Sequence, residues 1–158
     1  MLVLLVRHGQ AGSKRTWRDD DRLRPLTKLG QREAAALVGM LAPYGPTRIL
    51  SSPYERCLQT VAPLSEGLGL QVELTKDLVP DAAVAAETLL RQVARGEPGS
   101  VVVCTHGEVI HSLQTTFART SPAVFGTHPP RAKGSVWVLE RVGGHFVQGT
   151  YLAPGRSS

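Results

Sequence analysis

Residues 1–9 have the sequence MLVLLVRHG, in which six apolar residues are followed directly by arginine, histidine and glycine. An unbroken apolar stretch of this length is typical of a strand buried on both faces of a parallel sheet. In such a sheet, ligands bind at the edge where the carboxyl ends of the strands meet. The pattern therefore predicts a buried strand over residues 1–6 and places Arg7 and His8 at the ligand-binding edge.

Two further predicted strands also end in residues that suit an anion. A short strand over residues 48–51 precedes a helix whose first turn carries Arg56. A valine-rich strand over residues 101–105 is followed directly by His106 and Gly107. Because parallel strands share their carboxyl edge, we expect two histidines and two arginines to converge there.

These groups suit phosphoryl transfer, because the transition state spreads negative charge over oxygens that guanidinium groups bind through paired hydrogen bonds. Arg7 and Arg56 are expected to hold those oxygens, and Arg56 gains from its place at a helix N-terminus. A neutral imidazole can attack phosphorus, so His8 is the predicted nucleophile. His106 is expected to donate to a phosphoryl oxygen. The glycine after each histidine is expected to let the backbone approach the ligand closely.

Strands and helices alternate along the rest of the chain. Ser52 is the expected N-cap of the helix that carries Arg56, and Pro63 is expected to kink that helix or end it early. Gly143-Gly144 predicts a two-residue hairpin turn. The alternation predicts an α/β fold, a three-layer α/β/α sandwich around a mostly parallel, mixed sheet. We expect one domain over residues 1–152 and a flexible tail over residues 153–158. The other expected elements are helices from residue 27 to about 41, over 84–95 and through 109–117, and strands over 71–75, 135–141 and 145–152.

Charge and cysteine content narrow the range of partners. The chain has 18 Lys and Arg against 13 Asp and Glu, and this net charge of +5 suits an anionic ligand. The basic residues are scattered with few aromatics among them, so no nucleic-acid partner is expected. The first apolar stretch is too short to span a membrane. Cys57 and Cys104 do not form a disulfide framework, so we expect reduced thiols in a cytoplasmic protein.

Two other clusters have competing interpretations. His106, Glu108 and His111 have the residue types of a metal site, but the histidines are five apart, whereas the helical zinc pattern needs four. We therefore expect no metal and no cofactor. The basic residues of segment 14–22 follow the nucleophile and are interspersed with the aspartates at 19–21. They are equally consistent with binding further phosphates and with pairing among themselves.

Taken together, the motifs resemble those of the histidine phosphatase superfamily, the group with phosphoglycerate mutase-like members. Its hallmark is present as Arg7-His8-Gly9, its middle motif as SSPYERCLQT over residues 51–60, and its second histidine as His106-Gly107. Within the superfamily, RPLT at 24–27 and LVPD at 78–81 are similar to the short SixA-type phosphohistidine phosphatases. The stretch from Ala11 to Leu26 is also similar to the phosphatase domain fused to MutT-type Nudix hydrolases.

The resemblance implies a phosphohistidine intermediate on His8, no metal, and a set of residues that bind the phosphate. That set is Arg7, Gly9, Gln10, Arg56 and Gly107. The acid that larger members use as proton donor has no clear counterpart, and Asp81 is a candidate beside Glu87 and Glu108.

A pocket without a donor favours phosphoramidates and phosphoanhydrides, because a sugar alkoxide needs a proton in order to leave. The expected function is therefore that of a SixA-type protein phosphohistidine phosphatase. Hydrolysis of nucleotides or other small phosphoanhydrides is one alternative, and non-catalytic phosphate binding is another. The expected partner is a phosphorylated protein or a small phosphorylated molecule, with no membrane partner and the oligomeric state left open.

Overall fold

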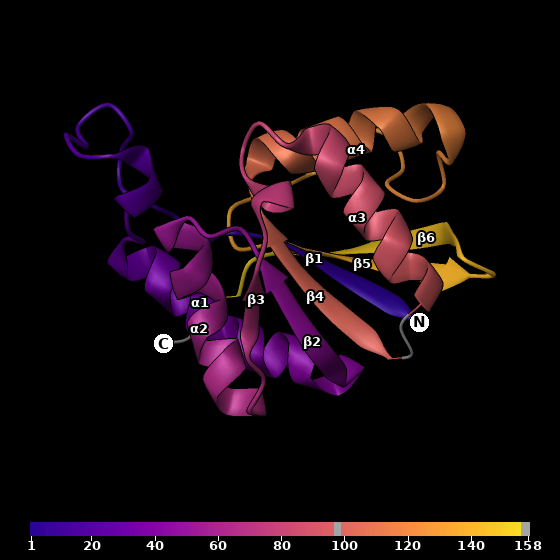
Figure 1. Ribbon diagram of the computed structural model, residues 1–158, viewed down its shortest axis with the longest axis horizontal. Helices are drawn as coiled ribbons and strands as arrows, with labels where there is room; N and C mark the ends of the chain where they lie inside the picture. The colour runs from indigo at the N-terminus through magenta and orange to yellow at the C-terminus, as the bar shows by residue number, and fades with distance from the viewer. Residues whose placement is uncertain (97–98, 156–158) are drawn as a thin grey trace.

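The computed structural model describes residues 1–96 and 99–155 of the chain (Figure 1). Its six strands form one sheet in the order β3-β2-β4-β1-β5-β6. Strands β1 to β4 are parallel, β5 is antiparallel to β1, and β6 is antiparallel to β5. The expected mixed, mostly parallel sheet is therefore confirmed. The strands are β1 (Leu2–Arg7), β2 (Pro46–Ser51), β3 (Val72–Leu74), β4 (Ser100–Thr105), β5 (Val136–Val142) and β6 (His145–Leu152).

Four helices cover the two faces of this sheet and complete the three predicted layers. Figure 1 shows α1 and α2 together on one face and α3 and α4 on the other. Short 3-10 turns lie at Asp21–Leu23, Ala42–Tyr44 and Lys76–Leu78. The helices are α1 (Lys28–Leu41), α2 (Glu55–Leu68), α3 (Ala83–Gly96) and α4 (Gly107–Thr120).

The central strand β1 supplies side chains to both hydrophobic cores. Leu4 and Val6 pack with the core under α1 and α2, whereas Val3 and Leu5 pack with the core under α3 and α4. All four side chains are buried, which explains why the apolar pattern is continuous rather than alternating. Burial on both faces holds the end of β1 in place, and with it the residues that follow.

The start of α2 differs from the prediction. The helix begins at Glu55 after Tyr54, and no side chain caps it, so the expected N-cap role of Ser52 is wrong. Pro63 lies inside α2, and the helix continues to Leu68, so the expected early end is also wrong. The buried side chains of Val61 and Leu64 on either side of Pro63 pack into the core and stabilise the helix there.

The hairpin between β5 and β6 has the predicted two-residue turn. Gly143 and Gly144 both have positive φ, 58° and 79°, as a two-residue hairpin turn between β5 and β6 requires.

Of the expected tail, residues 156–158 lie outside the described residues, and Gly155 lies against Ala36 and Met40 of α1. Within the described residues, no helix is both long and apolar enough to cross a membrane.

Candidate active site

A polar cavity of about 520 Å³ opens at the carboxyl edge of the sheet. It brings together residues from the end of β1, the first turn of α2 and the first turn of α4, as the sequence predicts. His106, which follows β4, lies beside it with its ring centroid 5.3 Å from that of His8. The cavity is lined by Arg7, His8, Arg24, Arg56, Glu108, Lys133 and the segment 11–15.

The ring of His8 is held in one tautomer by its own loop. Nδ1 lies 2.8 Å from the carbonyl oxygen of Gly9, and because a carbonyl can only accept, Nδ1 carries the hydrogen. The lone pair is therefore on Nε2. Burial, together with the charges of Arg56 and Arg7, lowers the pKa of His8 to about 3. The imidazole is thus neutral at cellular pH, the form required of a nucleophile.

His106 has one ring nitrogen engaged and one free. Nε2 lies 2.8 Å from the hydroxyl of Ser52 and 3.6 Å from the sulfur of Cys57. Nδ1 is buried without a hydrogen-bond partner among the described residues. Burial, together with the neighbouring His8 and Arg56, lowers the pKa of His106 to about 2. An unpaired polar atom in a buried position is costly, and a bound oxyanion would satisfy it.

The Arg7 side chain is positioned by one hydrogen bond and by packing over Gly107. One nitrogen donates to the carbonyl of Arg131 at 2.7 Å, and Nε has no partner among the described residues. The guanidinium also lies over Gly107, where an added Cβ would come within 2.6 Å of Cζ. Gly107 therefore makes room for Arg7, and this differs from the predicted role of letting the backbone approach the ligand.

Arg56 is held by the loop that follows β1. Its guanidinium donates to the carbonyl of Asp21 at 2.9 Å and to the carboxylate of the same residue at 3.2 Å. Arg24 donates to the other carboxylate oxygen of Asp21 at 2.9 Å. Hydrogen bonds and charge from both arginines lower the pKa of Asp21, outweighing burial, which raises it. One carboxylate therefore orients two arginines that line the cavity.

Gly9 and Gln10, just after the nucleophile, form hydrogen bonds and close contacts that hold its loop in place. The amide of Gly9 donates to the hydroxyl of Thr60, and a Cβ at Gly9 would lie 2.8 Å from the carbonyl oxygen of Gly30. Gln10 donates from its backbone to Glu33 and accepts from the hydroxyl of Thr27 through its side chain. Neither Gly9 nor Gln10 is among the residues that line the cavity, and their contact with phosphate stays a prediction.

Of the candidate proton donors, Asp81 is exposed in the turn before α3 and is not among the residues that line the cavity. Glu108, the first residue after Gly107, lines it instead. Its place follows from the position of α4, which begins directly at the carboxyl end of β4.

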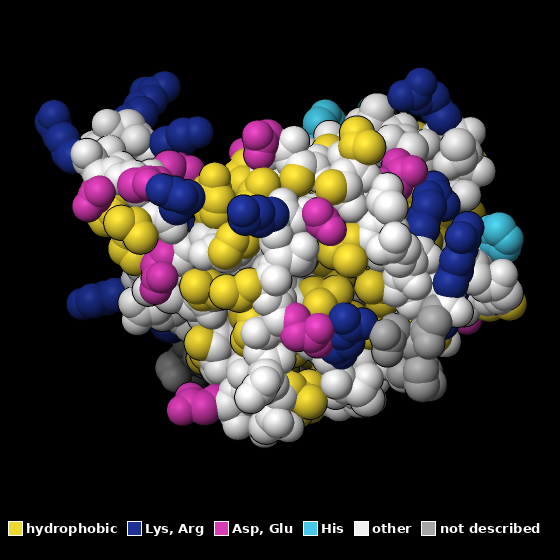
Figure 2. Space-filling view, viewed as in Figure 1, with side chains coloured by type: hydrophobic (Ala, Val, Ile, Leu, Met, Phe, Trp, Pro, Cys, Tyr) yellow, Lys and Arg dark blue, Asp and Glu magenta, His cyan; other side chains and the backbone are white. Residues whose placement is uncertain are grey.

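The cavity carries more positive charge than one phosphoryl group requires. Arg7, Arg24 and Arg56 line it together with Lys14, Arg15 and Lys133. Farther along the same loop, Asp20 pairs with Arg22 in an exposed ion pair. Figure 2 shows Lys and Arg side chains gathered on the loop that projects beyond α1, with acidic side chains close by. Asp20 and Arg22 therefore pair within segment 14–22, whereas binding of further phosphates by Lys14 and Arg15 stays a prediction.

The other candidate groups do not form a second reactive centre. Cys57 and Cys104 are free, buried thiols, and burial raises the pKa of Cys104. Among residues 1–96 and 99–155, no group of three or more His, Cys, Asp and Glu side chains could hold a metal ion. His111 is exposed, as expected of a surface residue.

Several residues of the site, among them Asp21, Arg24, Ser52 and Lys133, were not predicted because their roles depend on tertiary contacts. Ser52 has the sequence context of a helix cap, and only the fold shows that its hydroxyl contacts His106. Lys133 lies in a loop without a recognisable pattern and reaches the cavity because the segment before β5 passes beside β1.

An α/β sandwich with paired imidazoles and arginines at the carboxyl edge of its sheet defines a phosphoryl-binding protein of the phosphatase class. Comparison with known families agrees, since residues 3–79 match the model of the histidine phosphatase superfamily (branch 1). The chain belongs to the histidine phosphatase superfamily.

One characterised relative and several solved structures are similar to the chain. An 8-oxo-(d)GTP phosphatase from Mycolicibacterium smegmatis is 38% identical over 159 residues, a match covering 96% of this chain. The chain spans 48% of the length of that relative. The structure of the protein histidine phosphatase SixA complexed with tungstate has a TM-score of 0.75 and 24% identity, covering 99% of this chain and 97% of its own.

A second solved structure extends the likeness of fold. The mycobacterial glucosyl-3-phosphoglycerate phosphatase has a TM-score of 0.70 and 20% identity, covering 99% of both chains. At such low identity, the solved structures establish the fold, and the predicted α/β class is confirmed.

Proposed function

We propose that this chain is a phosphohydrolase in which His8 accepts the phosphoryl group and then passes it to water. The observation that carries the proposal is the hydrogen bond from Nδ1 of His8 to the carbonyl of Gly9. It leaves the lone pair on Nε2 in a cavity that Arg7 and Arg56 also line. Nucleophile and oxyanion donors therefore share one small space.

The reaction then takes two steps. Nε2 of His8 attacks phosphorus, the bond from phosphorus to the leaving group breaks, and the leaving group departs with the electron pair. Water next attacks the phosphohistidine, the phosphorus–nitrogen bond breaks, and the electron pair returns to the imidazole while a proton of the water passes to the released phosphate. Arg7 and Arg56 stabilise the charge that develops on the phosphoryl oxygens in both steps.

The substrate class we favour is a small phosphoanhydride such as a nucleoside di- or triphosphate. The additional cations Lys14, Arg15 and Lys133 in the cavity suit a ligand with more than one phosphate. The relative that is 38% identical is an 8-oxo-(d)GTP phosphatase, which supports the same class. A phosphate is also a good leaving group, so the reaction makes little demand on a proton donor.

Protein phosphohistidine is the second candidate. Imidazole leaves phosphorus more easily than an alkoxide, so the same residues suit this reaction. The side chains of Ser13, Lys14 and Arg15 at the cavity are exposed, and a protein surface could approach them. The motifs at residues 24–27 and 78–81 resemble those of SixA-type enzymes.

A turnover screen with an acid-labile trap tests these proposals. Guanosine di- and triphosphate, a phosphohistidine protein and an aryl phosphate are each assayed with wild-type protein and with His8→Ala. We expect an acid-labile phosphoenzyme in the wild type and none in His8→Ala. Turnover that persists in His8→Ala would refute the role of His8, and binding of phosphate without any turnover would leave a binding module. Faster turnover of phosphohistidine than of the nucleotides would reverse the order of the two substrate classes.

A further inference from the structure

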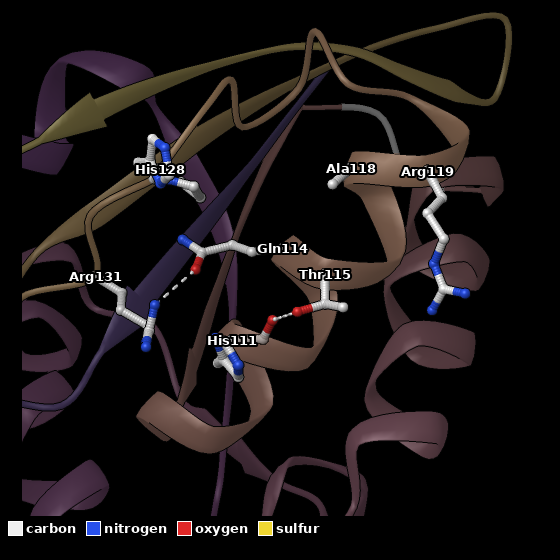
Figure 3. Close-up of a pocket in the computed structure, with 8 residues that line it drawn as sticks. His111, Gln114, Thr115, Ala118, Arg119, His128 and Arg131 are labelled. Carbon is white, nitrogen blue, oxygen red and sulfur yellow. Dashed lines mark hydrogen bonds between the residues drawn. The ribbon is translucent and has the colours of Figure 1, made fainter.

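A second cavity, of about 510 Å³, lies between α4 and the segment that leads into β5 (Figure 3). This volume is within the range that suits a small organic ligand. We call it the α4 groove. It is bounded by His111, Gln114, Ala118 and Arg119 from α4 and by His128 and Arg131 from the facing segment.

The α4 groove is continuous with the phosphoryl cavity. A shallower hollow of about 320 Å³ lies between them, and Arg7 and Glu108 line both this hollow and the phosphoryl cavity. His111 and Arg131 line both the hollow and the α4 groove. Arg131 is also bonded to the site directly, because its carbonyl accepts from the guanidinium of Arg7. A molecule bound by its phosphates at Arg7 can therefore extend along a connected surface.

Hydrogen bonds fix the wall of the groove before any ligand binds. Gln114 donates to the carbonyl of Pro130 at 3.0 Å and accepts from Arg131 at 3.3 Å, and Figure 3 shows this second contact. Trp137 of β5 donates to the same carbonyl at 2.9 Å. His128 has a φ of 50°, an uncommon conformation for a residue other than glycine. Backbone held in this way is found where a side chain has to be presented at a fixed place.

The lining of the groove is chemically selective. It offers the planar rings of His111 and His128 beside the small side chain of Ala118 and the ring of Pro129. Arg119 has no hydrogen-bond or ion-pair partner among residues 1–96 and 99–155, and no carboxylate belongs to the lining. Planar rings can stack on a base, and arginine donors pair with the acceptor edge of guanine.

We propose that the α4 groove binds the nucleoside part of a nucleoside di- or triphosphate whose phosphates occupy the cavity at His8. This inference rests on the proposed function, and it assigns the part of the substrate that does not react. The base stacks against the imidazole rings, and Arg119 donates to its acceptor edge. The groove then contributes to affinity for the nucleotide and contributes nothing to cleavage of an anhydride that lacks a nucleoside.

Guanosine diphosphate and inorganic pyrophosphate make the matched pair of substrates for a test. Ala118→Trp fills the groove, and His128→Asn removes a ring with a residue that tolerates positive φ. Thr120→Trp is the control, an equally large substitution at an exposed position of α4 that does not line the groove. We expect both groove variants to raise KM for guanosine diphosphate about tenfold, the equivalent of about 1.4 kcal/mol. The KM for pyrophosphate should be unchanged, and Thr120→Trp should resemble the wild type with both substrates.

Several results would overturn the inference. They are an unchanged KM for guanosine diphosphate in the groove variants, an equal rise for both substrates, and turnover of pyrophosphate without turnover of the nucleotide. Slower turnover of a phosphohistidine protein with guanosine diphosphate unaffected would instead assign the groove to a polypeptide.

A binding measurement separates failure of this inference from failure of the proposed function. If neither anhydride is hydrolysed, guanosine monophosphate is titrated into the wild type while the ring proton signals of His111 and His128 are followed by NMR. If the ring signals shift and saturate in the wild type but not in Ala118→Trp, the groove binds a nucleoside even though the proposed function fails. Unperturbed ring signals overturn the nucleoside site as well.

Discussion

The hydroxyl of Ser52 lies 2.8 Å from Nε2 of His106 and also accepts a hydrogen bond from the backbone amide of Tyr54. Because its oxygen accepts from that amide, the hydroxyl hydrogen is available to donate to Nε2. The remaining hydrogen of the imidazole would then be on Nδ1, the nitrogen that is buried without a partner. We propose that Ser52 fixes the tautomer in which His106 donates to a phosphoryl oxygen.

Ser52→Ala should therefore lower kcat by about tenfold to a hundredfold, or about 1.4 to 3 kcal/mol, because His106 loses the hydrogen bond that keeps its hydrogen on Nδ1. Steady-state kinetics check this, and Ser52→Thr should recover part of the activity because it restores the hydroxyl. Ser100→Ala is the control, since Ser100 is a buried serine at the start of β4 whose hydroxyl donates to the carbonyl of Tyr44, away from the site. An equal loss of kcat in Ser100→Ala would indicate a general effect on stability.

Asp20 and Asp21 are adjacent in the chain, but only Asp21 is expected to matter for catalysis. Asp21 holds Arg56 and Arg24, which line the cavity, whereas Asp20 pairs with Arg22 in water. Asp21→Ala should lower kcat/KM about tenfold, because Arg56 keeps its contact with the backbone carbonyl but loses the carboxylate, and a charge-assisted hydrogen bond contributes about 1.5–3 kcal/mol. Asp20→Ala should change it less than twofold, because water screens the exposed pair of Asp20 and Arg22. Equal effects of the two substitutions would contradict this assignment.

Gly107 should tolerate no side chain. An added Cβ would lie 2.6 Å from Cζ of Arg7, so Gly107→Ala must move the guanidinium away from its place in the cavity. We expect kcat/KM to fall about a hundredfold, on the scale of removing one oxyanion donor. Gly39→Ala is the matched control, because a Cβ there meets no atom within 4 Å. If both variants keep full activity, Arg7 does not hold the phosphoryl group from this position.

The two buried imidazoles should make the protein less stable in acid. The folded-state pKa is lowered to about 3 for His8 and about 2 for His106, whereas both titrate near 6.5 in an unfolded chain. Between these values the unfolded state binds more protons, so stability is fully present above pH 6.5 and falls as the pH is lowered. Each group should remove about 1.4 kcal/mol between about pH 7.5 and pH 5.5.

Urea unfolding at the two pH values checks this expectation. His8→Gln and His106→Gln should each show a smaller loss of unfolding free energy on acidification than the wild type. The same loss in all three proteins would mean that other groups control the response to acid.

A chelator should leave turnover unchanged, and vanadate should inhibit it. The charge on the phosphoryl oxygens is met by Arg7 and Arg56, so the proposed steps require no metal ion. Vanadate resembles the transferring phosphoryl group and should bind at the same residues, with weaker inhibition of Arg56→Ala than of the wild type. Turnover that a chelator abolishes and zinc or magnesium restores would contradict metal independence.

The buried strands and the placement of the main site residues could be predicted from the sequence, because each depends on a single physical requirement. The apolar stretches of β1 and β4 predict strands because a strand buried on both faces has little freedom in composition. Arg7, His8 and Arg56 could be placed together because parallel strands end at one edge.

Other features depend on which segments meet in space. Ser52 contacts His106, and Asp21 contacts Arg56 from the short 3-10 turn Asp21–Leu23. Gly107 is explained by the side chain of Arg7, a residue 100 positions earlier in the chain. Local patterns cannot reveal such contacts, since the same residues would also suit a cap, a surface loop or a turn.

The pairing of β1 with β4 places Arg7 opposite Thr105 in the sheet. A slip of one residue in either strand would turn every side chain of that strand to the other face and exchange the contents of the two cores. Descendants of this protein can therefore lengthen or replace the loops that meet the substrate, whereas insertion or deletion of a single residue within β1 or β4 would abolish folding and chemistry together.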